Sequence, residues 1–357
     1  MSTAAVEAVL NQRAEALLAH DAAGLRGTQA SRADAAVTAL GQRLAPLPVT
    51  AWHYQVTAVA AGPDPGQWTV QALLHYRLQG DPVDSTARRR LVVDADDGLR
   101  LLADDPDGAA LPWDLGVAGW AAGQTSFVLS VGGSPAPDLV AAADDAARAV
   151  TAVWGTRWRT APLIVATPGA AALAALVGRS PGSVAALVAV STPDRVYVDM
   201  PAYDALDPAG RQVLLTHEVT HVATAAGADR ASPQWLKEGF ADYVGFLHST
   251  IGVAQAAGPL LAQVRTDGPP ADVPTDSDFA PTAAAGTLAD AYAGSWLMCV
   301  LVADRAGQAA LVAVYRATAA GTGSADLNID SALRRATGRP LAWWTAAWRR
   351  DLVGLAA

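Results

Sequence analysis

Residues 215–222 read LTHEVTHV, and this stretch carries the strongest structural signal in the 357-residue chain. His217 and His221 are four residues apart, so in a helix they share one face and both imidazoles can reach one metal ion. Around the helix axis, Glu218 is rotated by roughly 100° from His217. It is therefore badly placed to be a third ligand, but it can reach a water molecule bound to the metal. Residues typical of helix ends predict the bounds of this helix: Asp207 as N-cap, Pro208 at the first position and Gly227 after the end.

A second helix is predicted directly downstream, where residues 232–243 read SPQWLKEGFADY. Ser232 is expected to cap it and Pro233 to take its first position. Because the connection is short, the two helices should be neighbours, and Glu238 then returns towards the histidine face. Two histidines, one glutamate and one open position form a known catalytic zinc set. Asp242, one turn beyond Glu238, can accept a hydrogen bond from a ligand histidine and fix its tautomer.

The two segments together resemble the gluzincin zinc metallopeptidases, in particular the peptidase MA-like group related to thermolysin and to the zinc aminopeptidases. The resemblance covers about residues 122–357 and implies one Zn²⁺ per chain, held by His217, His221 and Glu238. It further implies Glu218 as the general base and Asp242 as the aspartate that supports a ligand histidine. Only four glutamates occur in the chain, and two of them fall on the two glutamate positions of the motif.

In the aminopeptidase branch of this clan, a tyrosine that opens a third helix stabilises the tetrahedral intermediate. Tyr292 matches that tyrosine by order and local pattern; the alternative is a half-buried helix tyrosine. Ser295 stands where that branch has a lysine or a similar residue, and no G-x-M-E-N-like segment lies upstream. Endopeptidase action, aminopeptidase action and the absence of peptidase action are therefore equally open. The short strand 195–199 is expected at the edge of the cleft, where it could pair with an extended peptide.

The N-terminal part predicts a small α+β domain over residues 1–112, followed by the mainly helical domain over 122–357 with a short upstream sheet. The expected order is a helix over residues 2–19, a second helix capped by Ser31 and running to about Leu44, and then strands over 49–60, 67–79, 85–94 and 99–103. This order weakly resembles the nuclear transport factor 2-like (SnoaL-like) fold. Residues 104–123, rich in Asp, Gly and Pro, are expected to be a linker. The predicted fold class is α+β.

Composition excludes several classes of protein. The net charge of −9 disfavours nucleic-acid binding, and the only basic run, residues 88–90, is expected to form a solvated face. Cys299 is the only cysteine, so no intrachain disulfide and no cysteine-based zinc site can form; a buried apolar role is expected. No membrane span and no signal peptide are predicted. The sequence as it stands suggests a cytoplasmic protein, or an extracytoplasmic one if a signal or anchor was trimmed.

The first hypothesis is a zinc-dependent metallohydrolase, a peptidase acting on a peptide or protein substrate through water activated by Glu218. The alternative is a non-catalytic metal-binding scaffold whose N-terminal domain binds a ligand or partner. Trp343, Trp344 and Trp348 are expected to serve packing in either case.

Overall fold

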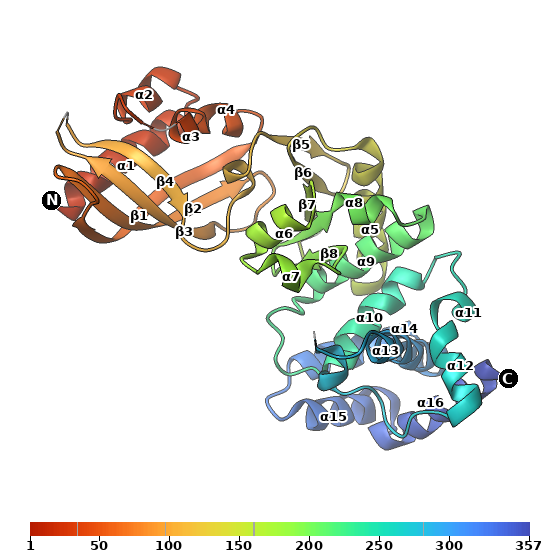
Figure 1. Cartoon of the computed structure of the whole chain (residues 1–357). Helices are drawn as coiled ribbons and strands as arrows, with labels where there is room; N and C mark the ends of the chain where they lie inside the picture. Colours follow the sequence, from red (N-terminus) through yellow and green to blue (C-terminus); the bar gives the residue numbers. More distant parts are fainter. Residues whose placement is uncertain (34, 97, 160, 281) are drawn as a thin grey trace.

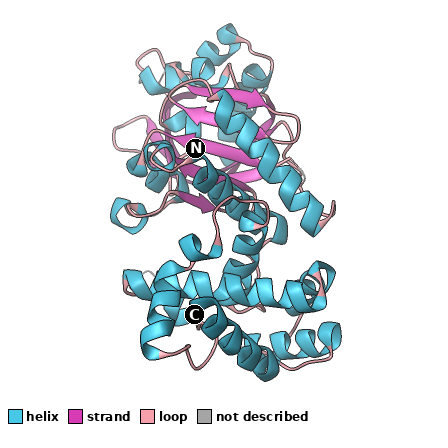
Figure 2. Ribbon diagram, turned by 90° about the vertical axis from the view of Figure 1, so that its right-hand side faces the viewer, coloured by secondary structure: helices cyan, strands magenta, loops and turns pink. Residues whose placement is uncertain are grey.

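The computed structural model describes residues 1–33, 35–96, 98–159, 161–280 and 282–357 (Figure 1). The protein is α+β, as predicted. An antiparallel sheet with four helices forms the N-terminal part, a second sheet occupies the middle, and the C-terminal part is helical (Figures 1 and 2).

The N-terminal sheet is a four-stranded antiparallel meander in the order β1-β2-β3-β4. Its strands alternate buried and exposed residues, and the buried face packs against α1. The predicted helix over residues 2–19 and the four predicted strands are confirmed. The second predicted helix, from Ser31 to about Leu44, is instead two short helices over 35–38 and 40–44, and Asp34 lies outside the described residues. The elements are α1 Thr3–Leu18, α2 Ala22–Gly27, α3 Ala35–Thr38, α4 Leu40–Leu44, β1 Val49–Ala61, β2 Gln67–Leu78, β3 Ser85–Asp94 and β4 Arg100–Pro106.

One prediction for this sheet is wrong. The basic run 88–90 does not form a uniformly solvated face, because Arg89 is 3% exposed and points to the inner side of β3. Its guanidinium donates to the carboxylates of Asp104 and Asp114 at 2.7 Å each. The period-two alternation of a strand sends the middle arginine inward and its two neighbours outward.

The second sheet has five strands in the order β5-β6-β7-β9-β8. The pairs β6–β7 and β7–β9 are parallel, whereas the outer strands β5 and β8 pair antiparallel. Both faces of this sheet are covered, since alternate residues of β6, β7 and β9 belong to two different hydrophobic clusters that also contain helix residues. The elements are η1 Pro112–Asp114, β5 Ala118–Ala122, β6 Phe127–Val131, α5 Pro137–Trp154, β7 Leu163–Thr167, α6 Ala170–Val177, α7 Pro181–Val184, β8 Ala189–Ser191, β9 Arg195–Asp199 and α8 Met200–Asp204.

This topology corrects two expectations. The strand β9 lies between β7 and β8, so the edge strand is β8 and not 195–199. The segment 104–123 is not simply a linker, since it contains the end of β4, the short helix η1 and the strand β5. The hydrophobic cluster of the first sheet also continues across the predicted boundary to Leu129 and Leu163 of the second sheet. The division into residues 1–112 and 122–357 stays a prediction.

Charged groups join the two sheets. Arg159 lies 2.9 Å from Asp81, which follows β2. Arg195, at the start of β9 and 2% exposed, donates to the Ser85 hydroxyl at 2.8 Å. These contacts attach the end of the β2–β3 hairpin to the second sheet, which in turn carries the helices of the site described below.

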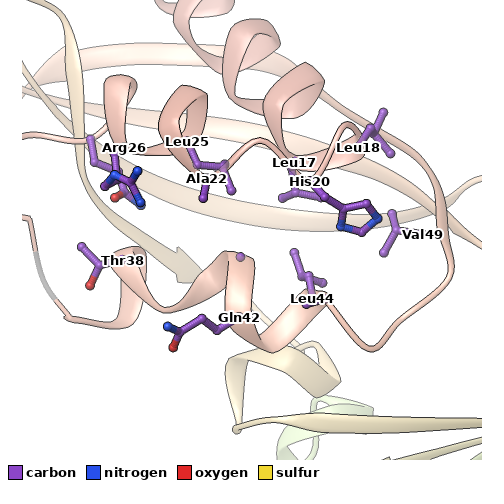
Figure 3. A pocket seen from close by; sticks show the side chains of 13 residues that line it. Leu17, Leu18, His20, Ala22, Leu25, Arg26, Thr38, Gln42, Leu44 and Val49 are labelled. Carbon is purple, nitrogen blue, oxygen red and sulfur yellow. The ribbon is translucent and has the colours of Figure 1, made fainter.

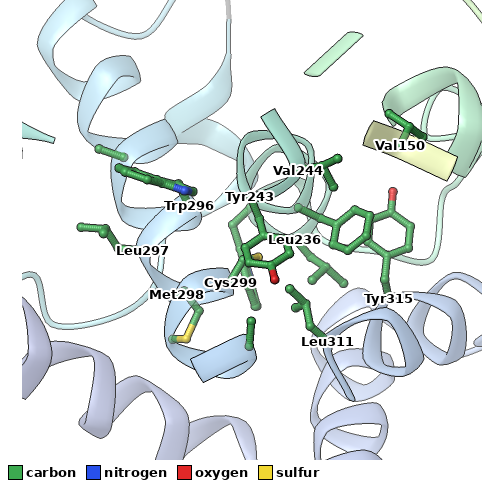
Figure 4. Packing of buried hydrophobic residues seen from close by; sticks show 14 of the residues in the cluster. Val150, Leu236, Tyr243, Val244, Trp296, Leu297, Met298, Cys299, Leu311 and Tyr315 are labelled. Carbon is green, nitrogen blue, oxygen red and sulfur yellow. The ribbon is translucent and has the colours of Figure 1, made fainter. Parts of the chain in front are cut away.

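The helical part packs around α13, which is surrounded by apolar side chains of several helices (Figure 4). Cys299 is fully buried there, and Trp344 and Trp348 are buried as well, so the expected packing roles are confirmed. The elements are α9 Pro208–Thr224, α10 Gln234–Phe246, α11 Val253–Ala256, α12 Gly258–Asp267, η2 Asp276–Phe279, α13 Ala285–Ala306, α14 Gln308–Ala319, α15 Ala325–Thr337 and α16 Leu341–Ala356.

The close crossing of α10 and α13 depends on a glycine. A Cβ atom on Gly239 would lie 2.3 Å from the carbonyl oxygen of Ser295, so no larger residue fits without separating the helices. Residues 286–306 of α13 are long and apolar enough to cross a membrane by length and composition alone, but most of this stretch is buried inside the protein. Such burial is typical of a core helix, and the close packing brings the first turns of α13 to the site.

Candidate metal centre

The helix α9 presents His217 and His221 on one face. Asp207 caps it by accepting a hydrogen bond from the Gly210 N–H at 2.7 Å, and Pro208 is the first residue, as predicted. The helix ends earlier than expected, at Thr224, because Ala225 adopts the left-handed conformation with φ of 54°. The four-residue spacing brings the two imidazole Nε2 atoms to 2.9 Å from each other.

The helix α10 begins differently from the prediction. Its N-cap residue is Pro233, and Ser232 makes no capping hydrogen bond. The N–H of Gln234 is instead accepted by Oδ1 of Asp276 at 2.8 Å, from a loop 42 residues downstream. A local Ser-Pro pattern predicted the place of this helix start, but the hydrogen-bond acceptor comes from tertiary structure.

Glu238 completes a triangle of ligand atoms. Its Oε2 lies 3.1 Å from Nε2 of His221 and 3.3 Å from Nε2 of His217. These three side chains can hold one metal ion. Tetrahedral zinc, with bonds of about 2.0–2.1 Å, places its ligand atoms about 3.3 Å apart, so the triangle has nearly the required size. The donor set of two imidazoles and a carboxylate also suits zinc.

Asp242 supports one of the two histidines. Its Oδ1 accepts a hydrogen bond from Nδ1 of His217 at 2.7 Å, as the sequence predicts. The proton on Nδ1 leaves the lone pair of Nε2 directed at the other two ligand atoms. The Nδ1 atom of His221 is buried and has no hydrogen-bond partner among the described residues, so the two histidines are held differently.

Electrostatics favour a cation inside the triangle. Burial by itself would lower the pKa of His217, but the carboxylates of Asp242 and Glu238 raise this pKa well above its usual value. Burial would raise the pKa of Glu238, but His221 and His217 lower it strongly. Both shifts have the same cause: the buried carboxylates and the facing imidazoles stabilise each other's charged forms.

Tyr292, near the start of α13, reaches the same site. Its ring centroid is 6.2 Å from that of His217, and its other side packs edge-on against Phe279 of η2 at 5.4 Å. Burial, followed by the nearby carboxylates of Glu238, Asp242 and Glu218, raises the pKa of Tyr292. The phenol therefore keeps its proton at neutral pH and can donate a hydrogen bond.

Glu218 lies beside the ligand residue His217 in the sequence of α9. Its side chain is 9% exposed. Glu238 and Asp242 are both bonded to histidines, whereas Glu218 takes part in none of the ion pairs between described residues. Of the six residues predicted for the site, the structure brings five into contact: His217, His221, Glu238, Asp242 and Tyr292. The sixth, Glu218, adjoins His217 on α9.

The sequence interpretation missed three contributors: Gln234, Asp276 and Phe279. Gln234 donates from Nε2 to Oε1 of Glu238 at 2.6 Å, and its position one helical turn before Glu238 was a usable signal. Asp276 and Phe279 belong to the long loop after α12, where no periodicity shows which side chains turn inward.

A separate pocket lies in the N-terminal part, between α1, α2 and α4 (Figure 3). Its volume is about 360 Å³. Leu17, Leu25 and Leu44 form apolar walls, with His20 and Arg26 among the polar lining residues. This pocket is large enough for a small molecule and shares no residue with the metal cluster.

No protein-family model matches the sequence, and no curated protein matches it either. The assignment of a function therefore depends on the geometry of the site.

Proposed function

We propose that this protein is a zinc-dependent metallohydrolase of the gluzincin type that cleaves peptide bonds. The observation that carries the proposal is the triangle of His217, His221 and Glu238 ligand atoms with Glu218 and Tyr292 beside it. A purely structural zinc site commonly has four protein ligands, whereas three ligands leave a position open for water or substrate.

The side chains of this chain suit the proposed reaction. A bound zinc ion would supply an activated water and polarise the scissile carbonyl. Glu218 takes the proton from the attacking water and passes it to the leaving amine. Tyr292, kept protonated by its buried and acidic surroundings, donates a hydrogen bond to the developing oxyanion. Asp242 holds His217 in the tautomer that offers Nε2 to the metal.

The second sheet offers a place for an extended substrate. The strand β8 is the outermost strand on its side and contacts the motif helix α9. We propose that a peptide pairs with β8 by strand addition, in place of the strand 195–199 expected from the sequence. The substrate class is therefore an extended peptide or an unfolded segment of a protein.

Metal analysis with a peptide screen tests the proposal. Purified protein should contain about one zinc per chain, and His217→Ala should lose it. The zinc-loaded wild type should cleave members of a peptide library, and Glu218→Gln should bind zinc without cleaving. Absence of metal from both proteins after incubation with zinc contradicts the metal centre.

The pocket of the N-terminal part favours one alternative, a metal-binding scaffold whose N-terminal domain binds a ligand. Stoichiometric zinc without cleavage of any library peptide would support this alternative. Binding of a small molecule that Leu25→Arg abolishes, with the zinc content unchanged, would assign the ligand to the pocket.

A further inference from the structure

The two carboxylate oxygens of Glu238 have different partners. Oε2 faces both histidines, whereas Oε1 accepts a hydrogen bond from the side-chain amide of Gln234 at 2.6 Å. The terminal torsion of a glutamate is soft, so an unrestrained carboxylate samples many orientations. The Gln234 amide removes that freedom and leaves Oε2 aimed at the point between the histidines.

Gln234 is itself held by the long loop after α12. It is the first residue of α10, and its backbone N–H has no acceptor within the helix because the first four N–H groups of an α-helix lack an intrahelical partner. Asp276 accepts this hydrogen bond at 2.8 Å. The loop around Asp276 is ordered by its own contacts, with the N–H of Thr275 donating to Asp278 at 2.7 Å and Phe279 packing on Tyr292.

We propose that Gln234 is a positioning residue for the metal ligand Glu238, and that Asp276 acts on the metal centre through Gln234. The contacts form one continuous chain from Asp276 to the Gln234 backbone and from the Gln234 amide to the Glu238 carboxylate. The loop between α12 and α13 thereby becomes part of the metal-binding apparatus. This inference rests on the metal centre of the proposed function but not on peptidase activity.

The two residues should differ in the size of their effect. Loss of a hydrogen-bond partner of a metal ligand typically weakens metal binding by about 10- to 100-fold. Asp276 only stabilises the helix start that carries Gln234, so its loss should weaken zinc binding by about two- to tenfold, the range of a lost helix cap. The effect of Asp276 should disappear once the amide of Gln234 is gone.

Zinc affinity of the full chain, measured by competition with a chelating dye, tests the proposal. Gln234→Met keeps the length of the side chain without its donor, and Gln234→Asn keeps the amide without its reach. Both should weaken zinc binding by about 10- to 100-fold. Asp276→Ala should weaken it less, and should add nothing in the Gln234→Met background. Gln263→Met, on an exposed position of α12, is the matched control and should bind as the wild type.

Three further measurements separate the possible outcomes. Thermal unfolding of the zinc-free Gln234→Met and Gln234→Asn variants should match the wild type, and the visible spectrum of the Co²⁺-loaded protein should change in Gln234→Met. Zinc binding by Gln234→Met and Gln234→Asn within about twofold of the wild type, or a full additional loss from Asp276→Ala in the Gln234→Met background, would overturn the proposal. Glu238→Ala is the reference: if it leaves zinc affinity unchanged, the metal centre itself is wrong, whichever result Gln234 gives.

Discussion

Asp242 accepts a hydrogen bond from Nδ1 of His217, with 2.7 Å between Oδ1 and Nδ1, and is 25 residues away in sequence, on the helix that also carries Glu238. One helix therefore supplies both a ligand and the group that orients another ligand. Moving α10 relative to α9 would disturb two of the three metal contacts together. The geometry of the centre thus depends on the packing between these two helices and on the helix α13 behind them.

Removal of Asp242 should weaken zinc binding. In Asp242→Ala, the ring of His217 loses the partner that fixes its tautomer and orientation, and zinc affinity should fall by about 10- to 100-fold. Dye competition measures the change. Asp304→Ala, on an exposed position of α13, should show no loss. Equal zinc affinity in Asp242→Ala and the wild type would show that the hydrogen bond is dispensable.

Glu218→Gln should retain zinc and lose activity. The amide cannot take a proton from water, so the rate of peptide cleavage should fall by about 10²- to 10⁴-fold. Zinc content and cleavage rate are measured on the same preparation. Glu15→Gln removes one of the other glutamates, on an exposed position of α1, and should leave both unchanged. A variant at position 218 with wild-type activity would remove Glu218 from the mechanism.

Tyr292→Phe should affect turnover more than metal binding. The lost hydroxyl is a hydrogen-bond donor to the oxyanion, and removal of one such donor typically lowers kcat by about 10²- to 10³-fold. Zinc affinity should stay within about twofold of the wild type, because the hydroxyl is not a ligand in the triangle. Tyr243→Phe removes a buried hydroxyl bonded to Gln308 and serves as the control. If kcat is unchanged in Tyr292→Phe, Tyr292 takes no part in catalysis and only packs against its neighbours.

The stability of the zinc-free protein should depend on the protonation of His217. Its pKa is raised in the folded state above the unfolded value of about 6.5. The resulting stabilisation is fully present below pH 6.5 and is lost as the pH rises through the raised folded pKa. Urea unfolding of EDTA-treated protein between pH 6 and pH 9 should show this decline, which His217→Asn should lack.

The zinc affinity should depend on pH in the opposite direction to the stability of the zinc-free protein. The metal competes with the proton on His217, so zinc affinity should rise by up to about tenfold per pH unit until His217 is deprotonated. Affinities measured by dye competition across the same pH range test the sign. A zinc affinity that falls as the pH rises would contradict the assignment of His217 as a ligand.

Gly239→Ala should destabilise the helical part. The new methyl group would meet the backbone of Ser295 at 2.3 Å, and forced overpacking of this kind costs about 1–3 kcal/mol. The free energy of unfolding in urea gives the change. Gly354→Ala provides the control, since open space surrounds that glycine in α16 and alanine is the better helix former. The opposite order of stabilities would show that α10 and α13 can separate at little cost.

Local sequence determined much of this protein. The spacing of His217, Glu218 and His221 places them on one helix, and the short connection returns Glu238 and Asp242 to them, because helical periodicity and chain connectivity act over a few residues. The alternation of apolar and polar residues likewise predicted the strands of the N-terminal meander. The apolar residues around Cys299, Trp344 and Trp348 in the sequence predicted that these side chains are buried.

Tertiary structure decided the features that depend on contacts between distant residues. The strand order places β8, and not residues 195–199, at the edge of the second sheet. Arg89 lies on the buried face of β3, where its guanidinium pairs with Asp104 and Asp114. The N–H of Gln234, the first residue of α10, has no partner within the helix and is accepted by Asp276. These two residues are 42 positions apart, so only the completed fold decides that they meet.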